Sequence, residues 1–300
     1  MFLTPPSVGA SLLAIDPFCS EKDRQRAGSY KRGRTERGFT LVELIMVIAL
    51  AGIVAVMIST VMSRPLQGFV DQSRRAELTD LAAMALNRMV RDIRLAVPNS
   101  LVATDATQLH FVSISAAGRY RANQPDLEGP RQDPPACTQP SGKCVIEILS
   151  PIEPSSSTTE HWLIIYNTET LVNRPESSDG DVSVISPKAF TWQNGTLNAD
   201  LSNFRFQYAS AQHRFYLAKE VVGYRCEEGN LWRETYETYE TLNVNGAPAS
   251  SAKVVNSATC SFRYEPGTQA RNGLVTLHLS LTKGGETVSL LQQVHVDNAP

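Results

Sequence analysis

Residues 37–44 read RGFTLVEL and open an apolar run that continues to Met62. Between Phe39 and Met62, Glu43 is the only ionisable side chain. At about 1.5 Å of rise per residue, a helix over these residues is about 36 Å long and can cross a bilayer once. The run therefore predicts a transmembrane helix. Its carboxylate needs a partner from outside the segment, because an isolated charge is costly in an apolar environment.

The segment before this run is rich in basic residues, which favours a cytoplasmic N-terminus and an exported remainder. These residues are Lys22, Arg24, Arg26, Lys31, Arg32, Arg34 and Arg37. A secretory signal peptide is one alternative, but its apolar core is about 7–15 residues long and precedes a small-residue cleavage site. A plain signal anchor fits the length and leaves Glu43 unexplained. A lipoprotein signal at Cys19 is a further alternative, but Asp16-Pro17-Phe18 before this cysteine are not the apolar and small residues that such a signal has.

A basic leader that ends in Gly38 and continues Phe-Thr-Leu-Val-Glu into an apolar run resembles the class III signal of type IV prepilins and pseudopilins. In that family a prepilin peptidase cuts after the glycine and methylates the new N-terminus. The resemblance implies cleavage between Gly38 and Phe39 and N-methylation of Phe39. It also implies that Glu43 pairs with the N-terminal amine of a neighbouring subunit. The implied partners are the peptidase, other major and minor pilins, and the inner-membrane assembly platform.

Two further blocks narrow this resemblance. Residues 64–80, RPLQGFVDQSRRAELTD, and residues 293–298, QVHVDN, resemble the MshO-type minor pilins of the MSHA pilus system. That family is similar in layout to PilW-type minor pilins and to the J-type pseudopilin of type II secretion. The resemblance implies an α+β, pilin-like fold, in which a long N-terminal transmembrane helix packs on an antiparallel β-sheet head.

Helical periodicity continues beyond the apolar run, and Pro65 is expected to kink or break the helix. Pro98 ends it. Apolar residues recur with helical spacing at Leu78, Ala82, Ala85, Met89, Ile93 and Ala96. The expected organisation is a cytoplasmic leader at 1–38, a transmembrane and assembly half-helix at 39–62, a periplasmic half-helix at 63–97 and a β-rich head at 98–300.

Short segments rich in aromatic and β-branched residues predict strands in the head. They are Gln108–Ser115, Val145–Leu149, Trp162–Tyr166, Phe204–Tyr208, His213–Ala218 and Ser261–Tyr264. Phe204, Phe206 and Tyr208 alternate with polar residues, which indicates a sheet with one face exposed to solvent. The long polar loops at 122–143 and 167–181 are partner-facing candidates or ordinary solvated connections.

The C-terminus predicts a β-hairpin with a two-residue turn at Gly284-Gly285. Apolar and polar residues alternate on both sides of this turn. The turn pairs Lys283 with Glu286, Leu281 with Val288, Leu279 with Leu290 and Val275 with Val294. This register places His278 opposite Leu291 and His295 opposite Leu274, so the two histidines are not a ligand pair.

Four cysteines fall in the exported part, namely Cys137, Cys144, Cys226 and Cys260. An even number in an oxidising compartment indicates two disulfides, and three pairings are possible. The pairing of Cys137 with Cys144 and of Cys226 with Cys260 follows chain order and closes the shortest loops. Unpaired surface thiols remain an alternative for the first pair. A zinc site lacks the usual ligand spacing.

The sequence carries no nucleophile elbow, no phosphate-binding glycine loop and no paired-histidine metal motif. Glu176, Asp179 and Asp181 could offer oxygen ligands to calcium, although a polar turn is the simpler interpretation because the fuller calcium-loop spacing is missing. Residues 39–300 are mildly acidic, which does not suggest a nucleic-acid surface. We therefore expect a membrane-inserted minor pilin with no cofactor, metal site or catalytic activity. It would prime assembly or cap the tip of a pilus or pseudopilus. The alternatives are a J-type pseudopilin and a membrane-anchored periplasmic binding module.

Overall fold

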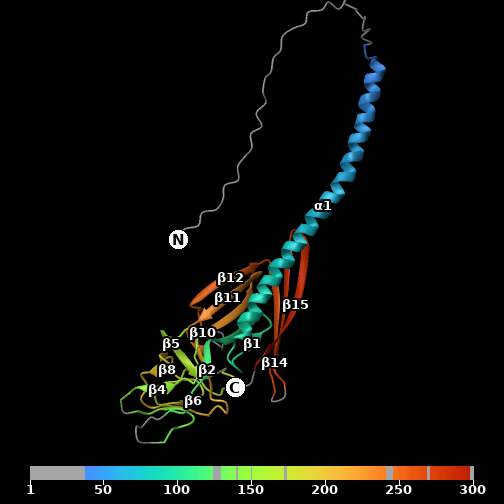
Figure 1. The fold of residues 1–300 in the computed structure, drawn as a ribbon. Helices are drawn as coiled ribbons and strands as arrows, with labels where there is room; N and C mark the ends of the chain where they lie inside the picture. Colours follow the sequence, from blue (N-terminus) through green and yellow to red (C-terminus); the bar gives the residue numbers. More distant parts are fainter. Residues whose placement is uncertain are drawn as a thin grey trace, which may run out of the picture. The chain divides into compact units, whose positions relative to one another are not determined.

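The computed structural model describes residues 38–123, 130–139, 141–149, 151–171, 174–240, 246–268 and 271–297, without the side chains of 63–66. The predictions for the leader before Gly38, including Cys19, lie outside these residues. The chain divides into two compact units, Met1–Thr60 and Val61–Pro300, which are described separately here. Figure 1 shows the helix α1 and the strands that follow it.

The helix α1 comprises Leu41–Arg94, close to the predicted 39–96. It runs through Pro65 as one helix, so the break expected there is wrong. A proline removes a single backbone hydrogen bond, and the long helical segments on both sides carry the helix across it. The C-terminus of α1 carries Arg91 and Arg94 in its last turn, where cations interact favourably with the helix dipole.

The strands described here form three sheets. The largest has nine strands in the order β1-β2-β10-β5-β7-β8-β4, with β11 paired to β10 and β12 paired to β11. These strands are β1 Val102–Asp105, β2 Gln108–Arg119, β4 Cys144–Glu147, β5 Ser157–Ile164, β7 Phe190–Gln193, β8 Thr196–Ala199, β10 Arg214–Glu227, β11 Asn230–Tyr236 and β12 Ser250–Asn256. All their pairings are antiparallel.

The two smaller sheets have three strands each among the described residues. One has the order β13-β14-β15, and the other has the order β3-β9-β6. Their strands are β13 Ala258–Glu265, β14 Gly273–Lys283, β15 Glu286–Val296, β3 Ala136–Cys137, β9 Phe204–Phe206 and β6 Val182–Ser183. The pairing of β6 with β9 is parallel, and all other pairings between the described strands are antiparallel. A long apolar N-terminal helix followed by mainly antiparallel sheets confirms the predicted α+β architecture of pilin type.

The predicted strands are all present, with different ends. The strand expected at Trp162–Tyr166 begins earlier and stops at Ile164, and the one expected at His213–Ala218 continues to Glu227. In β9, Phe204 and Phe206 are buried and alternate with an exposed residue, as predicted. Tyr208 lies beyond the strand and is exposed.

The core of the second unit forms where one face of α1 meets the sheets. All six positions predicted to face the core are buried; five of them lie in α1, and Ala96 lies just beyond its end and forms a β-bridge with Ser113. They pack with Phe111 of β2, Tyr224 of β10, and Leu277 and Leu279 of β14. In Figure 1 this part of α1 runs beside β10, β11 and the β14–β15 hairpin. The 3.6-residue spacing of small and medium apolar side chains thus determines which helix face the head covers.

The β14–β15 hairpin has the predicted register at every pair. Lys283 pairs with Glu286, and the pairing continues without a shift to Gly273 and Val296. Gly284 and Gly285 have φ values of 59° and 85°, the left-handed conformations that a two-residue hairpin turn requires. The hairpin end contacts α1, because Lys283 bonds Glu77 at 2.6 Å and Glu286 accepts from Arg75 at 2.7 Å. Both ion pairs are largely exposed and screened by solvent, so neither adds much to the stability of the fold.

Buried charge links α1 to the large sheet. The Asp92 carboxylate accepts hydrogen bonds of 2.7 Å from the Tyr224 hydroxyl and from Nε of Arg233. Burial raises the pKa of Tyr224, and its bond to Asp92 raises it further. Beside this group, Glu234 is 1% exposed and accepts from Arg225 and Tyr236. Burial alone would raise the pKa of Glu234, but these donors hold it below its usual value.

Candidate functional site

The candidate site is the first part of α1 with the three residues before it, Gly38, Phe39 and Thr40. Thr40 caps the helix, because its Oγ1 accepts the backbone N–H of Glu43 at 3.3 Å and its carbonyl accepts that of Leu44 at 3.1 Å. A threonine followed three residues later by glutamate is the capping-box pattern. Residues 40–43 carry this signal in the sequence, although no helix cap was predicted there. Thr40 and Glu43 therefore also have a local role in starting the helix.

The side chains around the predicted cleavage point are open. Phe39 is 81% exposed. A Cβ built on Gly38 meets no described atom within 4 Å, so the fold of this chain does not itself require glycine there. A requirement for glycine at this position would then come from a protein that binds the segment.

The apolar side chains from Leu41 to Met62 are uncovered in this single chain. The helix is long and apolar enough to cross a membrane, and its most apolar stretch is not buried by any described part of the chain. Thr60 satisfies its hydroxyl by donating to the carbonyls of Val56 and Met57, at 3.2 and 3.0 Å. Glu43 has no ion-pair partner among the described residues. Its carboxylate is thus the one charged group on this apolar surface.

Each disulfide joins two different sheets. Cys137 of β3 is bonded to Cys144 of β4, with their Cα atoms 4.7 Å apart. Cys226 of β10 is bonded to Cys260 of β13, with a Cα separation of 6.1 Å. This is the pairing that chain order favours. The bonds connect both small sheets to the large one.

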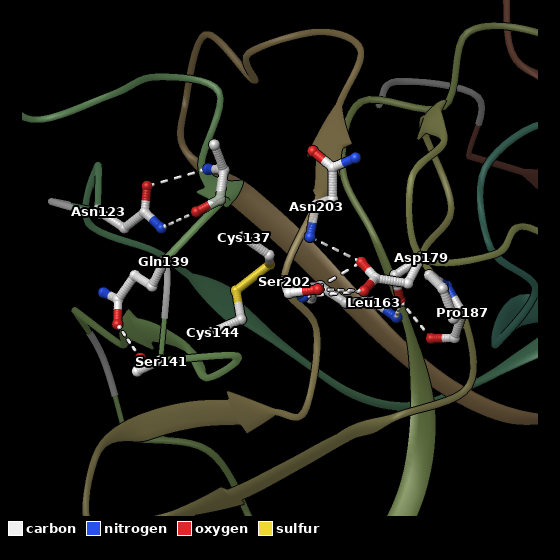
Figure 2. Close-up of a disulfide and its surroundings, with 12 residues drawn as sticks. Asn123, Cys137, Gln139, Ser141, Cys144, Leu163, Asp179, Pro187, Ser202 and Asn203 are labelled. Atoms are coloured by element: carbon white, nitrogen blue, oxygen red, sulfur yellow. Dashed lines mark hydrogen bonds between the residues drawn. A yellow bond between two sulfur atoms is a disulfide. The ribbon is translucent and has the colours of Figure 1, made fainter. Parts of the chain in front are cut away.

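Hydrogen bonds from side chains hold the loops around the first disulfide. Asn123 bonds the backbone of Ala136 through both ends of its amide, at 2.6 and 3.0 Å (Figure 2). Asp179 accepts from the backbone N–H groups of Ser202 and Asn203 and from the Ser202 hydroxyl at 2.7 Å. Although burial acts in the opposite direction, these donors lower the pKa of Asp179.

The predicted oxygen ligands around Asp179 are used within the protein. Asp181 accepts from the N–H of Ser178 at 2.7 Å, and Glu176 accepts from that of Tyr239 at 3.3 Å. Among the described residues, no group of three or more histidine, cysteine, aspartate or glutamate side chains could hold a metal ion. This geometry is that of a hydrogen-bonded turn.

Comparison with known proteins gives one match. Residues 33–59 match the family model described as the prokaryotic N-terminal methylation motif. No curated protein and no solved structure matches the chain significantly. The matched residues contain Gly38, Phe39 and Glu43 and extend along most of the uncovered apolar helix. The motif points to a structural protein rather than an enzyme, and with the apolar helix it supports membrane anchoring and a periplasmic head. The match therefore supports a type IV prepilin-like N-terminal segment, of the kind that prepilin peptidase processes.

Proposed function

We propose that this chain is a minor pilin of an MSHA-like type IV pilus. The prepilin peptidase cleaves it between Gly38 and Phe39 and methylates the amine of Phe39. The mature chain is anchored in the inner membrane, with its two disulfides in the periplasmic head. It then joins other pilins through α1 at the assembly platform, where it primes assembly or occupies the tip.

One observation carries this proposal: a single carboxylate, Glu43, lies on an otherwise apolar and uncovered helix surface inside the matched motif. A carboxylate in an apolar setting is stable when it is paired and hydrogen-bonded. The free amine at Phe39 of a neighbouring subunit would supply that pair, and packing of neighbouring helices would cover the apolar surface. No catalysis by this chain is needed.

The mature N-terminus tests the proposal. The protein is purified from membranes with and without the prepilin peptidase, and its N-terminal peptide is analysed by mass spectrometry. We expect N-methylated Phe39 only when the peptidase is present. Gly38→Ala should leave the chain uncleaved, because the peptidase is expected to recognise this glycine. The fold itself should be unaffected, because the surroundings of Gly38 are open. A cut at another position, or methylation without the peptidase, would contradict the proposal.

The second candidate is a J-type pseudopilin of type II secretion, since the same helix and processing would serve that machine. Co-purification separates the two, because a pilus component should be recovered with pilin subunits and a pseudopilin with the secretion platform. A membrane-anchored periplasmic binding module is the third candidate. That module would keep its function when the leader is not processed, which the uncleaved Gly38→Ala protein would reveal.

A further inference from the structure

A groove opens on the head where strand pairing is irregular, between β2 and β10 and between β5 and β7. Its volume is about 370 Å³, within the range of about 300–1,000 Å³ that is usual for small-molecule sites. It is lined by residues of β2, β5, β7 and β10. All of these belong to the second unit, so the groove is independent of the N-terminal segment and of the function proposed for it.

The pairing of β2 with β10 shifts beside the groove. Leu217 pairs with Ala116, but Ala218 pairs with Ile114, so Ser115 is skipped. The next pair is Glu220 with Ser113, so Lys219 is skipped in turn. An extra residue in a strand redirects side chains, and such bulges are frequent next to binding sites. Here Ser115, Lys219 and Glu220 all line the same groove.

A third irregularity lies on the strand across the groove. In β5, Ser157 pairs with Trp192, but the next pair is His161 with Phe190. Between these two pairs, β5 advances by four positions while β7 advances by two. Thr159 lies in this irregular stretch of β5. Ser157 and Thr159 both line the groove. Three separate departures from ladder pairing thus direct hydroxyl and charged side chains into one space.

The floor of the groove is rigid. His161 is 3% exposed, its Nδ1 lies 2.7 Å from the carbonyl of Thr159, and its ring meets the Trp192 ring edge-on at 4.9 Å. The indole N–H of Trp192 donates to the carbonyl of Pro154 at 2.7 Å. Burial lowers the pKa of His161, so the imidazole is neutral at neutral pH. The polar atoms of the floor are therefore bonded to backbone carbonyls of Thr159 and Pro154, two residues that also line the groove.

The wall groups, by contrast, are available. Among the described residues, the side chains of Ser113, Ser115, Lys219 and Glu220 form no hydrogen bond or ion pair with one another or with a neighbour. Hydroxyls can both donate and accept, the ammonium only donates and the carboxylate only accepts. One cation and one anion leave the wall without net charge. Such a surface suits a ligand without net charge that presents many donors and acceptors.

We propose that this groove binds a short, uncharged saccharide. Sugar hydroxyls donate and accept in the same way as the serine and threonine hydroxyls that line the walls. Ile114 and Pro154, which also line the groove, offer apolar surface to the C–H face of a sugar ring. An anionic ligand would meet Glu220, and a cationic ligand would meet Lys219, so a charged compound gains less here than a neutral one.

A glycan array tests the proposal. The full chain is labelled, kept in detergent and applied to immobilised neutral, sialylated and sulfated oligosaccharides. Titration calorimetry then measures the dissociation constants of the compounds that bind, with free amino acids and dipeptides as further probes. We expect at least one neutral oligosaccharide to bind with a dissociation constant between about 10 μM and 1 mM. Binding restricted to charged glycans, amino acids or dipeptides would overturn the proposal, as would no binding.

Substitutions of groove residues test whether the saccharide binds in the groove. Ser115→Ala combined with Lys219→Met should weaken binding about tenfold or more, because two contacts to the ligand are lost. Thr159→Val provides a second, independent variant if the first does not fold, and circular dichroism checks folding. The matched control is Ser280→Ala with Ser289→Ala, whose exposed hydroxyls bond each other at 2.7 Å on β14 and β15. Unchanged affinity in both groove variants, or equal loss in the control, would overturn the proposal.

Discussion

The backbone amide of Glu43 donates a hydrogen bond to Oγ1 of Thr40, so the residue proposed to pair with a neighbouring subunit is also part of a helix cap. Two roles for Glu43 therefore compete. In the first, its charge pairs with the amine of a neighbouring subunit. In the second, its side chain serves only the capping box at the start of α1. A substitution to alanine removes both and cannot separate them.

Glu43→Gln separates the two roles, because glutamine also serves at this position of a capping box but carries no charge. We expect Glu43→Gln and Glu43→Ala to be inserted and cleaved normally. Both should enter filaments or initiation complexes at least about tenfold less than the wild type, since an ion pair in an apolar setting is lost. Immunoblots of sheared pili and of cross-linked membranes measure the incorporation.

Thr60→Ala is the matched control on the same helix, since the Thr60 hydroxyl bonds carbonyls of its own helix. It should assemble as the wild type does. Normal assembly of Glu43→Gln together with failure of Glu43→Ala would assign Glu43 to the cap and exclude charge pairing.

The periodic parts of the fold could be predicted from the sequence. The helix face and the β14–β15 register follow from local patterns, because spacings of 3.6 and 2 residues define one buried side. The β7–β8 hairpin was missed although Asn194-Gly195 is a strong local turn signal, and these residues have φ values of 52° and 76°. The β10–β11 hairpin at Glu228-Gly229 has similar values, 49° and 72°.

Other features could not be predicted in this way because they depend on residues far apart in the chain. Asp92 and Tyr224 are 132 positions apart, and only the packing of α1 on β10 brings them together. The saccharide groove depends on where strand pairing shifts, which no local pattern records. In the candidate site, the motif, Glu43 and the Thr-x-x-Glu capping pattern at residues 40–43 can be read from the sequence, whereas the exposure of Gly38 needed the structure.

The bond between Asp92 and Tyr224 anchors α1 to the head. We expect Asp92→Ala to lower the free energy of unfolding by about 2–3 kcal/mol, since it leaves a buried hydroxyl and Arg233 without their acceptor. Asp92→Asn should cost less, because its amide oxygen still accepts from Tyr224. Thermal unfolding of the full chain in detergent measures the loss, and Asp80→Asn, exposed on the same helix, is the control. A loss below about 0.5 kcal/mol in Asp92→Ala would contradict the anchor.

The two disulfides should differ in their effect on stability. Cys226–Cys260 joins residues 34 positions apart, whereas Cys137–Cys144 joins residues 7 apart. On the chain-entropy model the first contributes about 3.8 kcal/mol and the second about 2.4 kcal/mol. Paired Cys→Ala variants are compared by thermal unfolding under oxidising conditions. The loss of Cys226–Cys260 should lower the melting temperature more, and the reverse order would show that native packing around Cys137 outweighs loop length.

His110 makes the stability of the head depend on pH. It is 1% exposed, its Nδ1 has no hydrogen-bond partner in the described structure, and burial lowers its pKa from the ordinary 6.5. Glu234 and Asp105 act in the opposite direction, and Arg225 reinforces the lowering. Between the folded pKa and about 6.5 the unfolded chain binds more protons, so the free energy of unfolding decreases as the pH falls below about 6.5.

His110→Phe should therefore flatten the pH dependence of unfolding between pH 7 and pH 5. The range stays above the usual pKa of carboxylates, so Glu234 does not contribute to the change. Other groups with shifted pKa values contribute to the slope that remains, including His161, whose pKa is lowered by burial, and Glu176, whose pKa is raised by burial. At pH 7 the variant should be at least as stable as the wild type, because a buried polar atom without a partner is removed. Melting curves at half-unit pH steps measure the slope, with His295→Phe as the exposed control. An unchanged slope in His110→Phe would show that His110 does not titrate on unfolding in this range.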